Sequence, residues 1–486
     1  MNYKMIGRYI SLIIAVAGVF MLPAMILSFA DGDAAVGRAF VYTMILSGAI
    51  AGVLIPLCKR PEKGFYAREG LLVVGVGWIV ISLIGCLPFV ISGAIPQFVD
   101  ALFEIVSGFT TTGATILRDV EALPRGLLYW RSFSHWLGGM GVLVFLLAIA
   151  PAGGKSGFTI HLLRAESTGP NVGKLVPKMR KTAMILYVIY IALTVLDLIF
   201  LLFGGMPFFD AICTAFGTAG TGGFGVRNDS IAGYSTYIQG VCTVFMLLFG
   251  VSFTLFFMLL LRDFKGVVRN TELRMYLGIV AVSTAVMTFN IRGLYPTLFK
   301  AFHHAVFQVS SIMTTTGFAT ADFDKWPSLS KAILLVLMLV GACAGSTGGG
   351  FKCGRLLLLL KALRRNIHKT LHPQRVEVIQ VDGQIIDEEV VSKTNAYLCA
   401  YVVIMILSFL AISIDGFSVT TNMSAVVACF NNIGPGLDMV GPVGTYADYS
   451  VFSKLVLIFD MLAGRLEIFP ILILFSRSTW RRGGAN

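Results

Sequence analysis

Two runs of threonine and glycine interrupt otherwise apolar sequence, and they are the residues best suited to chemistry. The segment SGFTTTGATIL occupies residues 107–117, and SSIMTTTGFATADF occupies residues 310–323. Small side chains leave backbone carbonyl oxygens accessible, and rings of such oxygens replace the hydration shell of a cation in channel filters. The runs therefore indicate cation binding by the backbone. For any single run, the alternative is a simple cap on a buried helix.

The same device occurs four times along the chain, which makes helix capping alone a poor explanation. Each copy is a half-length apolar segment that ends in small polar residues and a glycine. Self-similarity at a fixed period, here roughly 100 residues, is the sequence signature of an internal repeat. The aligned copies are FVDALFEIVSGFTTTG (98–113), FFDAICTAFGTAGTGG (208–223), FHHAVFQVSSIMTTTG (302–317) and VTTNMSAVVACFNNIG (419–434).

The half-length segments predict helices that enter the membrane and turn back. Non-helical backbone at membrane depth survives only where it lines a water-filled cavity or is buried in protein. Asp100 and Asp210 stand at the start of the first two segments, as N-cap residues do. The glycine loops then lie at the negative ends of the helix dipoles. Four such ends aimed at one centre attract a cation, so we interpret the loops as four quarters of one ion-selective filter.

The composition requires a membrane around these elements. The 486 residues are 56% hydrophobic and 13% charged, with a mean hydropathy of +0.82, and a soluble protein cannot cover so much apolar surface. Runs of this length and polarity predict transmembrane helices. We expect ten spans, at about 9–29, 38–58, 70–92, 132–152, 183–205, 236–261, 276–294, 330–360, 396–415 and 451–476.

The positive charges predict the orientation of these spans. Basic clusters at 59–68, 174–181, 262–274 and 361–375 all fall on one side if there are ten spans, and such loops are cytoplasmic. Both termini are then cytoplasmic, and the net charge of +12 is mainly a topology signal rather than a sign of nucleic-acid binding. The eight cysteines lie in or beside apolar runs without a CxxC pair, which favours packing residues over disulfides or metal ligands.

With these motifs in place, the chain resembles the bacterial Trk/Ktr/HKT potassium transporter superfamily, and most closely its TrkH-type membrane subunit. Three further segments carry the resemblance: RSFSHWLGGMGVLVF (131–145), GACAGSTGGGFKCGR (341–355) and MLAGRLEIFPILIL (461–474). The resemblance implies a pore for potassium in the bacterial inner membrane, with no cofactor on this chain. It also implies a homodimer and a cytosolic ring of TrkA-like nucleotide-binding subunits.

The expected fold is an all-α polytopic membrane protein. Four pseudo-symmetric hairpins, each of span, pore half-helix, filter loop and span, surround one central pore and follow two extra N-terminal helices. We place the two extra helices at 1–65, the hairpins at 66–160, 161–270, 271–372 and 396–486, and a cytoplasmic linker at 373–395.

The resemblance assigns the filter loops residue by residue. A serine in place of the first glycine goes with sodium transport in the related plant transporters, so Gly113 favours potassium. The outer Tyr-Gly pair of a potassium-channel filter is missing, and we expect looser discrimination. The predicted filter residues are Thr111, Thr112, Gly113, Thr221, Gly222, Gly223, Thr315, Thr316, Gly317, Asn432, Ile433 and Gly434.

A second device is expected below the filter, in the eighth span. Five glycines among residues 341–350 should unwind a helix, since each costs about 1 kcal/mol relative to alanine. The resemblance makes this an intramembrane loop that plugs the pore, with Arg465 nearby. The alternatives are close helix packing by small residues and an Arg465 salt bridge to Glu467 or Asp460. The predicted gate residues are Gly345, Ser346, Thr347, Gly348, Gly349, Gly350 and Arg465.

Other functions fit the sequence less well. An ion-coupled secondary transporter also uses glycine-broken helices, although such proteins usually repeat in two halves. An intramembrane enzyme would need an HExxH, GxSxG or similar pattern, and GGKS at 153–156 lacks the glycine that a phosphate-binding loop requires. His303 and His304 should diverge on a helix near the outer mouth. The polar stretch 374–395 predicts a small hairpin at its Asp-Gly pair, either a docking surface or a plain linker.

Overall fold

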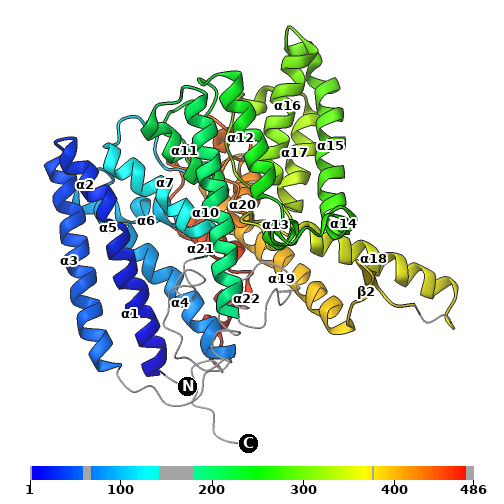
Figure 1. Ribbon diagram of the computed structural model, residues 1–486, viewed down its shortest axis with the longest axis horizontal. Helices are drawn as coiled ribbons and strands as arrows, with labels where there is room; N and C mark the ends of the chain where they lie inside the picture. Colours follow the sequence, from blue (N-terminus) through cyan, green and yellow to red (C-terminus); the bar gives the residue numbers. More distant parts are fainter. Residues whose placement is uncertain (1–2, 59–66, 142–178, 375–376, 478–486) are drawn as a thin grey trace, which may run out of the picture.

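The computed structural model describes residues 3–58, 67–141, 179–374 and 377–477. Within them the chain is almost entirely helical (Figure 1). Some predicted features therefore lie outside the described residues, namely the end of the fourth span (142–152), the GGKS motif and most of the basic clusters at 59–68 and 174–181.

Two helical segments precede the first repeat, as the sequence predicts. The first is divided at Met21 into α1 (Tyr3–Phe20) and α2 (Leu22–Ala30), and the second is α3 (Ala34–Leu57). Pro23 lies in the first turn of α2, where its missing N–H costs no helical hydrogen bond. The proline thus explains where the first segment restarts.

Four repeats follow, and in each a half-helix lies between two other helical segments. The first contains α4 (Ala67–Gly85), α5 (Leu87–Ile91), the half-helix α6 (Phe98–Phe109) and α7 (Arg125–Gly139). The second contains α10 (Met179–Phe203), the half-helix α11 (Phe208–Gly220), α12 (Thr236–Phe249), α13 (Phe253–Leu260) and α14 (Phe264–Arg269). The third contains α15 (Thr271–Ile291), η1 (Arg292–Leu294), the half-helix α16 (Leu298–Met313), η2 (Phe323–Lys325), α17 (Ser328–Val340) and α18 (Cys353–Leu371). The fourth contains α19 (Glu388–Ile412), η3 (Ser413–Asp415), the half-helix α20 (Val419–Phe430), η4 (Asp438–Val440), α21 (Val451–Arg465) and α22 (Phe469–Phe475).

Several predicted spans are not continuous helices. Among the described residues, six helical segments are long and apolar enough to cross a membrane without a sharp break. The predicted span 236–261 bends by 89° between α12 and α13, and the eighth breaks after Val340, as its glycines predict. The last span, 451–476, breaks where Glu467 and Ile468 have φ of 60° and 64°. Hydropathy reports only apolar character, so it does not reveal the bend or the last break.

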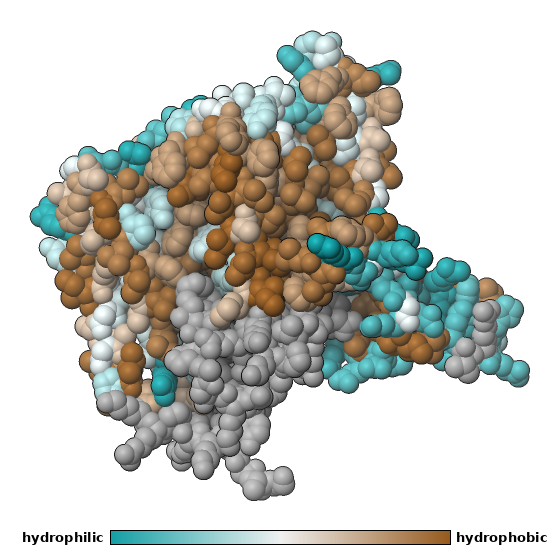
Figure 2. All heavy atoms as spheres, viewed as in Figure 1, coloured by the Kyte–Doolittle hydropathy of each residue, from teal (hydrophilic) through white to brown (hydrophobic). Residues whose placement is uncertain are grey.

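The outer surface of the helices carries a broad apolar band. Figure 2 shows brown side chains over most of the helical body, with teal along the upper edge and on the projecting α18. Exposed residues of this band include Ile45, Phe203, Phe289 and Leu410, each at least 60% exposed. A contiguous apolar surface of this size is the face that a bilayer covers.

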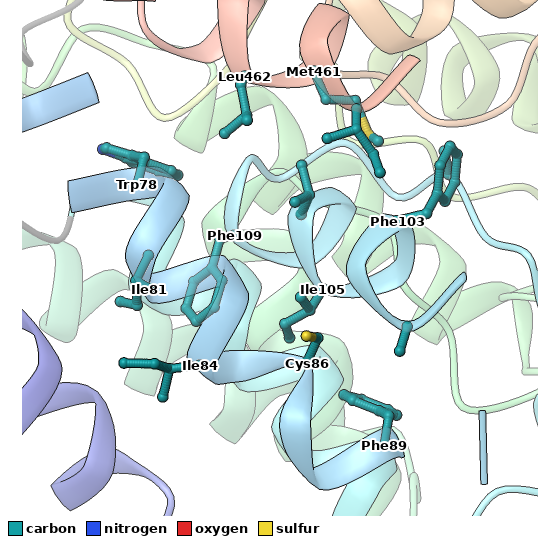
Figure 3. Close-up of a cluster of buried hydrophobic side chains, with 14 of the residues drawn as sticks. Trp78, Ile81, Ile84, Cys86, Phe89, Phe103, Ile105, Phe109, Met461 and Leu462 are labelled. Carbon is teal, nitrogen blue, oxygen red and sulfur yellow. The ribbon is translucent and has the colours of Figure 1, made fainter. Parts of the chain in front are cut away.

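Buried apolar side chains fix the first half-helix in place. In Figure 3, Phe109 of α6 lies among Trp78, Ile81 and Ile84 of α4, and Met461 of α21 lies near the same helix. These five side chains are between 0 and 7% exposed. Close packing of this kind resists displacement of a helix because any gap loses dispersion contacts. The rigid wall positions the loop that follows α6.

A short hairpin follows α18, and α18 and the hairpin together form a projecting arm (Figure 1). Strands β1 (Gln380–Val381) and β2 (Gln384–Ile385) pair antiparallel around Asp382 and Gly383. Both turn residues have positive φ, 51° and 79°, which is the backbone of the type I′ turn that Asp-Gly favours. The predicted hairpin is confirmed. Since α19 begins at Glu388, the helix starts within the predicted linker 373–395.

Candidate functional site

The four half-helices end with one shared backbone motif. In the turn just past each half-helix, Thr111, Thr221, Thr315 and Asn432 have φ of 56°, 54°, 60° and 55°. Left-handed backbone is unusual for non-glycine residues and a genuine outlier for β-branched threonine. The strain recurs at aligned positions of all four copies, and such strain persists only where surrounding structure enforces it.

Backbone hydrogen bonds explain how each half-helix turns into its loop. The Thr112 amide donates to the Ser107 carbonyl at 2.8 Å, and the Thr111 amide donates to the Gly108 carbonyl at 3.1 Å. This pair of bonds is the Schellman pattern at a helix C-terminus. The same two bonds recur in the other copies, from Gly222 and Thr221, from Thr316 and Thr315, and from Ile433 and Asn432. The internal repeat is therefore a structural repeat.

The four glycines bring the loops together in a closed ring. A Cβ atom added to Gly113 would lie 2.1 Å from the Gly222 carbonyl oxygen, and one added to Gly223 would lie 2.0 Å from that of Thr316. An added Cβ on Gly317 would lie 2.1 Å from the Ile433 oxygen, and one on Gly434 would lie 2.7 Å from the Thr112 oxygen. Each loop thus contacts the next in chain order, and the fourth contacts the first. The predicted filter residues are brought together around one axis.

The ring opens outward into a shared cavity of about 160 Å³, which is lined by all four glycines. Each glycine has φ between 76° and 92°, so none can carry a side chain without strain. Backbone carbonyls of small residues are well placed to replace the hydration shell of a cation at such a ring.

Two polar side chains that the sequence did not single out hold the loops to their neighbours. His135 of α7 has its Nδ1 at 2.8 Å from the Gly108 carbonyl, and its Nε2 accepts the Phe224 amide at 3.2 Å. Tyr446 donates its hydroxyl to the Gly434 carbonyl at 2.7 Å. His135 lies within the stretch 131–145, where a histidine in an apolar run was an available signal.

Asn432 connects the fourth loop to the first. Its side-chain amide donates to the Thr112 hydroxyl at 3.0 Å and to the Met461 carbonyl at 2.9 Å. Among the predicted filter residues, this is a direct side-chain contact between two repeats that lie far apart in sequence. It closes the ring on the side where the loop sequences differ most.

The outer loops of the first two repeats are also joined, through Asn228. Its side-chain amide donates to Asp119 at 2.8 Å, and its side-chain oxygen accepts the Val120 amide at 2.8 Å. The bond from Asn228 lowers the pKa of Asp119. In the fourth repeat, the hydroxyls of Ser418 and Thr421 lower the pKa of Asp438 in the same way. Both carboxylates therefore stay ionised at the outer surface near neutral pH.

The prediction that Asp100 and Asp210 cap their half-helices is wrong. The N-cap residues are Gln97 and Pro207, so each aspartate lies in the first turn. Asp100 instead accepts from Lys454 at 2.7 Å, and Asp210 accepts the Tyr234 hydroxyl at 2.8 Å. A carboxylate in the first turn still interacts favourably with the positive end of the helix dipole. The difference arises because each helix begins three residues earlier than a cap at the aspartate requires.

The predicted histidine geometry is confirmed. His303 lies 2.7 Å from the Gln239 side-chain oxygen, and His304 lies 3.1 Å from the Thr320 hydroxyl. Two adjacent side chains on α16 thus reach different partners, as expected for neighbours on a helix.

The glycine-rich segment between α17 and α18 lies directly against the filter loops. The Gly349 amide donates to the Thr315 hydroxyl at 2.6 Å, and an added Cβ on Gly349 would lie 2.5 Å from the Asn431 carbonyl oxygen. The segment also fills the break of the bent span, because the Phe253 amide donates to the Gly345 carbonyl at 3.0 Å. The sequence did not predict this second contact, since the bend itself was missed.

Arg465 joins this segment to the first repeat. It donates to the carbonyls of Thr347 at 2.9 Å and Gly139 at 2.6 Å, and also to that of Gly138. The carboxylates considered as alternative partners have contacts of their own. Glu467 accepts from Arg355, and Asp460 accepts the Ser408 hydroxyl at 2.6 Å.

Lys352 directly follows the glycine-rich segment, and the sequence did not single it out. It is 1% exposed and donates to the Gly348 carbonyl. A lysine inside a glycine-rich apolar run was the available signal, because an intramembrane charge is a functional-site hypothesis by default.

The fold and the site define a membrane transport protein of the pore-loop class, with four re-entrant half-helices around one axis. The chain belongs to the TrkH family, described as cation transport protein, which matches residues 36–299 and 295–481. This result confirms the resemblance drawn from the motifs, and the family is one of transporters rather than enzymes.

Similar proteins cover the whole chain. Trk system potassium uptake protein TrkH of Salmonella typhimurium is 37% identical over 99% of this chain and 100% of its own length. Trk system potassium uptake protein TrkG of Escherichia coli is 33% identical over 95% of each chain. The crystal structure of the potassium transporter TrkH from Vibrio parahaemolyticus is 32% identical, covers 99% of this chain and 100% of its own, and superposes with a TM-score of 0.88.

Proposed function

We propose that this chain is the ion-translocating pore subunit for potassium uptake. One observation carries the proposal: the four loops form a closed ring. In this ring Gly113, Gly223, Gly317 and Gly434 each lie against a carbonyl group of the next loop. Four half-helix C-termini then point their negative dipole ends at one axis. The names of full-length relatives, which describe potassium uptake proteins, support potassium as the substrate.

In this proposal the twelve predicted filter residues bind the dehydrated ion through backbone oxygens, with hydroxyls of Thr112, Thr315 and Thr316 supporting the loops. The gate is formed by residues 345–350 together with Arg465, which lie below the filter and close the path. Contacts of this segment with Thr315 and Asn431 support that position.

An ion-coupled secondary transporter is the second candidate, because glycine-broken helices are shared with that class. Potassium flux into liposomes that contain the purified protein separates the two. A pore should carry potassium down its own gradient at an unchanged rate whether or not a sodium or proton gradient is present. Flux that requires either gradient would favour the coupled mechanism.

We further propose that the chain lies in the bacterial inner membrane with both termini cytoplasmic. The basic clusters support this orientation. The relatives belong to a Trk system, which favours assembly with other components. We propose a homodimer and a cytosolic TrkA-like nucleotide-binding ring that controls the gate.

The projecting arm offers a surface on which such a ring can be tested. Arg365 pairs with Glu388, and Lys361 donates to the Gln380 carbonyl, so both hold the arm together. Arg364 and Lys369 are exposed and can be changed with less structural risk. We expect changing both to glutamine to weaken pull-down of the ring, since a basic face attracts an acidic or nucleotide-bearing partner.

The matched control is Lys325→Gln, which neutralises an exposed lysine in η2, between α16 and α17. It should leave the pull-down unchanged. Equal binding by the Arg364 and Lys369 variant and by the control would remove this arm as the docking surface.

A further inference from the structure

A buried ion pair lies behind the first half-helix, and neither residue belongs to the predicted filter or gate. Glu104 of α6 is 0% exposed and Arg131 of α7 is 2% exposed. The Arg131 Nε donates to the Glu104 Oε1 at 2.5 Å. Desolvating two charges often costs as much as their attraction returns, so such a pair is weak support for stability. The role of this pair is therefore better judged from the residues that it holds in place.

The carboxylate holds the outer end of the first loop. The Thr115 hydroxyl donates to the two Glu104 oxygens at 3.0 Å each, and the Ile116 amide donates to the Oε2 at 3.0 Å. Thr115 and Ile116 follow Gly113 by two and three residues. Hydrogen bonds to a charged acceptor are stronger than neutral ones, so Glu104 fixes where the first loop leaves the ring.

The guanidinium holds the outer end of the second loop. The Arg131 Nη1 donates to the Gly225 carbonyl at 3.0 Å, and its central carbon lies 3.5 Å from the centre of the Phe224 ring. Phe224 directly follows Gly223. One ion pair thus spans the junction between the first and second loops, where Gly113 lies against the Gly222 carbonyl group.

The aligned positions in the other repeats do not carry this charge. Thr214, Gln308 and Ala425 occupy the place of Glu104 in the second, third and fourth half-helices. Gln308 is 0% exposed, and within the described residues its side-chain amide has no hydrogen-bond partner. The charged connection therefore belongs to the first junction.

We propose that Glu104 and Arg131 are positioning residues that set ion selectivity. The proposal rests on the function proposed above for the loops as a filter. Thr111 and Thr221 hold strained backbone just before the two glycines, and strain persists only when neighbours enforce it. By fixing the residues that follow each glycine, the pair holds the carbonyls of two loops at the spacing that discriminates potassium from sodium.

The test is the ratio of potassium to sodium flux in liposomes that contain equal amounts of folded protein. The double variant Glu104→Gln with Arg131→Met removes both charges together, which avoids leaving one buried charge unpaired. We expect its ratio to fall roughly tenfold, as for the loss of a hydrogen bond to a charged group, while cation flux itself persists. The milder Thr115→Val should lower the ratio by about threefold, because it removes the hydroxyl that donates to Glu104 but keeps the ion pair and the Ile116 hydrogen bond.

The matched control is Gln308→Met at the aligned position of the third half-helix, and its flux ratio should be that of the original protein. Unchanged ratios in the double variant and in Thr115→Val would overturn the proposal and make the pair purely structural. If the double variant does not insert, an unchanged ratio in Thr115→Val alone overturns it. The Gly113→Ser variant tests the filter assignment separately from the role of the ion pair. An unchanged flux ratio in Gly113→Ser would show that the loops are not the filter, whatever the ion-pair variants do.

Discussion

Replacing Gly113 by serine is expected to abolish most of the preference for potassium over sodium. A Cβ atom at this position would lie 2.1 Å from the Gly222 carbonyl oxygen, which is backbone and has no rotamer to move. The φ of 80° adds strain of roughly 1–2 kcal/mol for any L side chain. The second loop must shift outward, and the widened ring then admits a hydrated or differently sized ion. Uptake of potassium and sodium into liposomes measures the change.

A matched control distinguishes the lost contact from the backbone strain. Gly416 has a similar φ of 76° but no atom within 4 Å of an added Cβ. Gly416→Ser should therefore add a similar backbone strain of roughly 1–2 kcal/mol and leave selectivity unchanged. A Gly113→Ser protein that keeps the original ion preference would show that the four loops are not the filter.

The repeat and its filter loops were predictable because they depend on local sequence. A half-length apolar segment followed by small residues and glycine is visible in each copy, and the aligned positions of Thr111, Thr221, Thr315 and Asn432 adopt the same strained backbone. Hydropathy predicted ten runs, and their described parts are mainly helical, with breaks at residues 250–252, 341–352 and 466–468.

What the sequence did not reveal depends on contacts between distant segments. The break between α12 and α13 is filled by the glycine-rich segment, where the Phe253 amide donates to the Gly345 carbonyl. Neither partner identifies the other in the sequence. Likewise, Glu104 and Arg131 are single charges in apolar runs, and their pairing follows only from how α6 packs beside α7. Asp100 lies in the first turn of α6 rather than at its cap, and its partner Lys454 is 354 residues away.

The proposed gate segment has a geometry that allows it to be shortened. Its ends lie together, since an added Cβ on Gly341 would be 3.2 Å from the Gly350 Cα, and the Cys353 amide donates to the Ala342 carbonyl at 2.9 Å. A loop with closed ends resembles an Ω-loop, whose tip can be trimmed without pulling its stems apart. Removal of residues 346–349 should therefore leave α17 and α18 in place.

We expect this deletion, or Arg465→Ala, to raise basal potassium flux severalfold without abolishing selectivity. Arg465 holds the segment through the Thr347 carbonyl and ties it to the Gly139 carbonyl of α7. Its charge also opposes a passing cation, by roughly 4 kcal/mol at about 4 Å in an effective dielectric near 20. Alanine removes the tether and the positive charge together, whereas the deletion removes the obstruction and, with Thr347, the tether, but keeps the charge. Rubidium uptake into liposomes, or patch recordings, measures basal flux, and sodium uptake reports selectivity.

Arg274→Ala is the matched control, because Arg274 also donates to a backbone carbonyl, that of Val268, but does so at an exposed site. Its basal flux should be that of the original protein. The two gate variants differ in one further respect, because Arg465→Ala keeps the contact of Gly349 with Thr315 and the deletion removes it. If the loop itself is the main obstruction, basal flux should rise less in Arg465→Ala than in the deletion variant. If both variants fold, insert and conduct no more than the original, then the segment and the arginine only hold helices together, and the gate lies elsewhere along the pore.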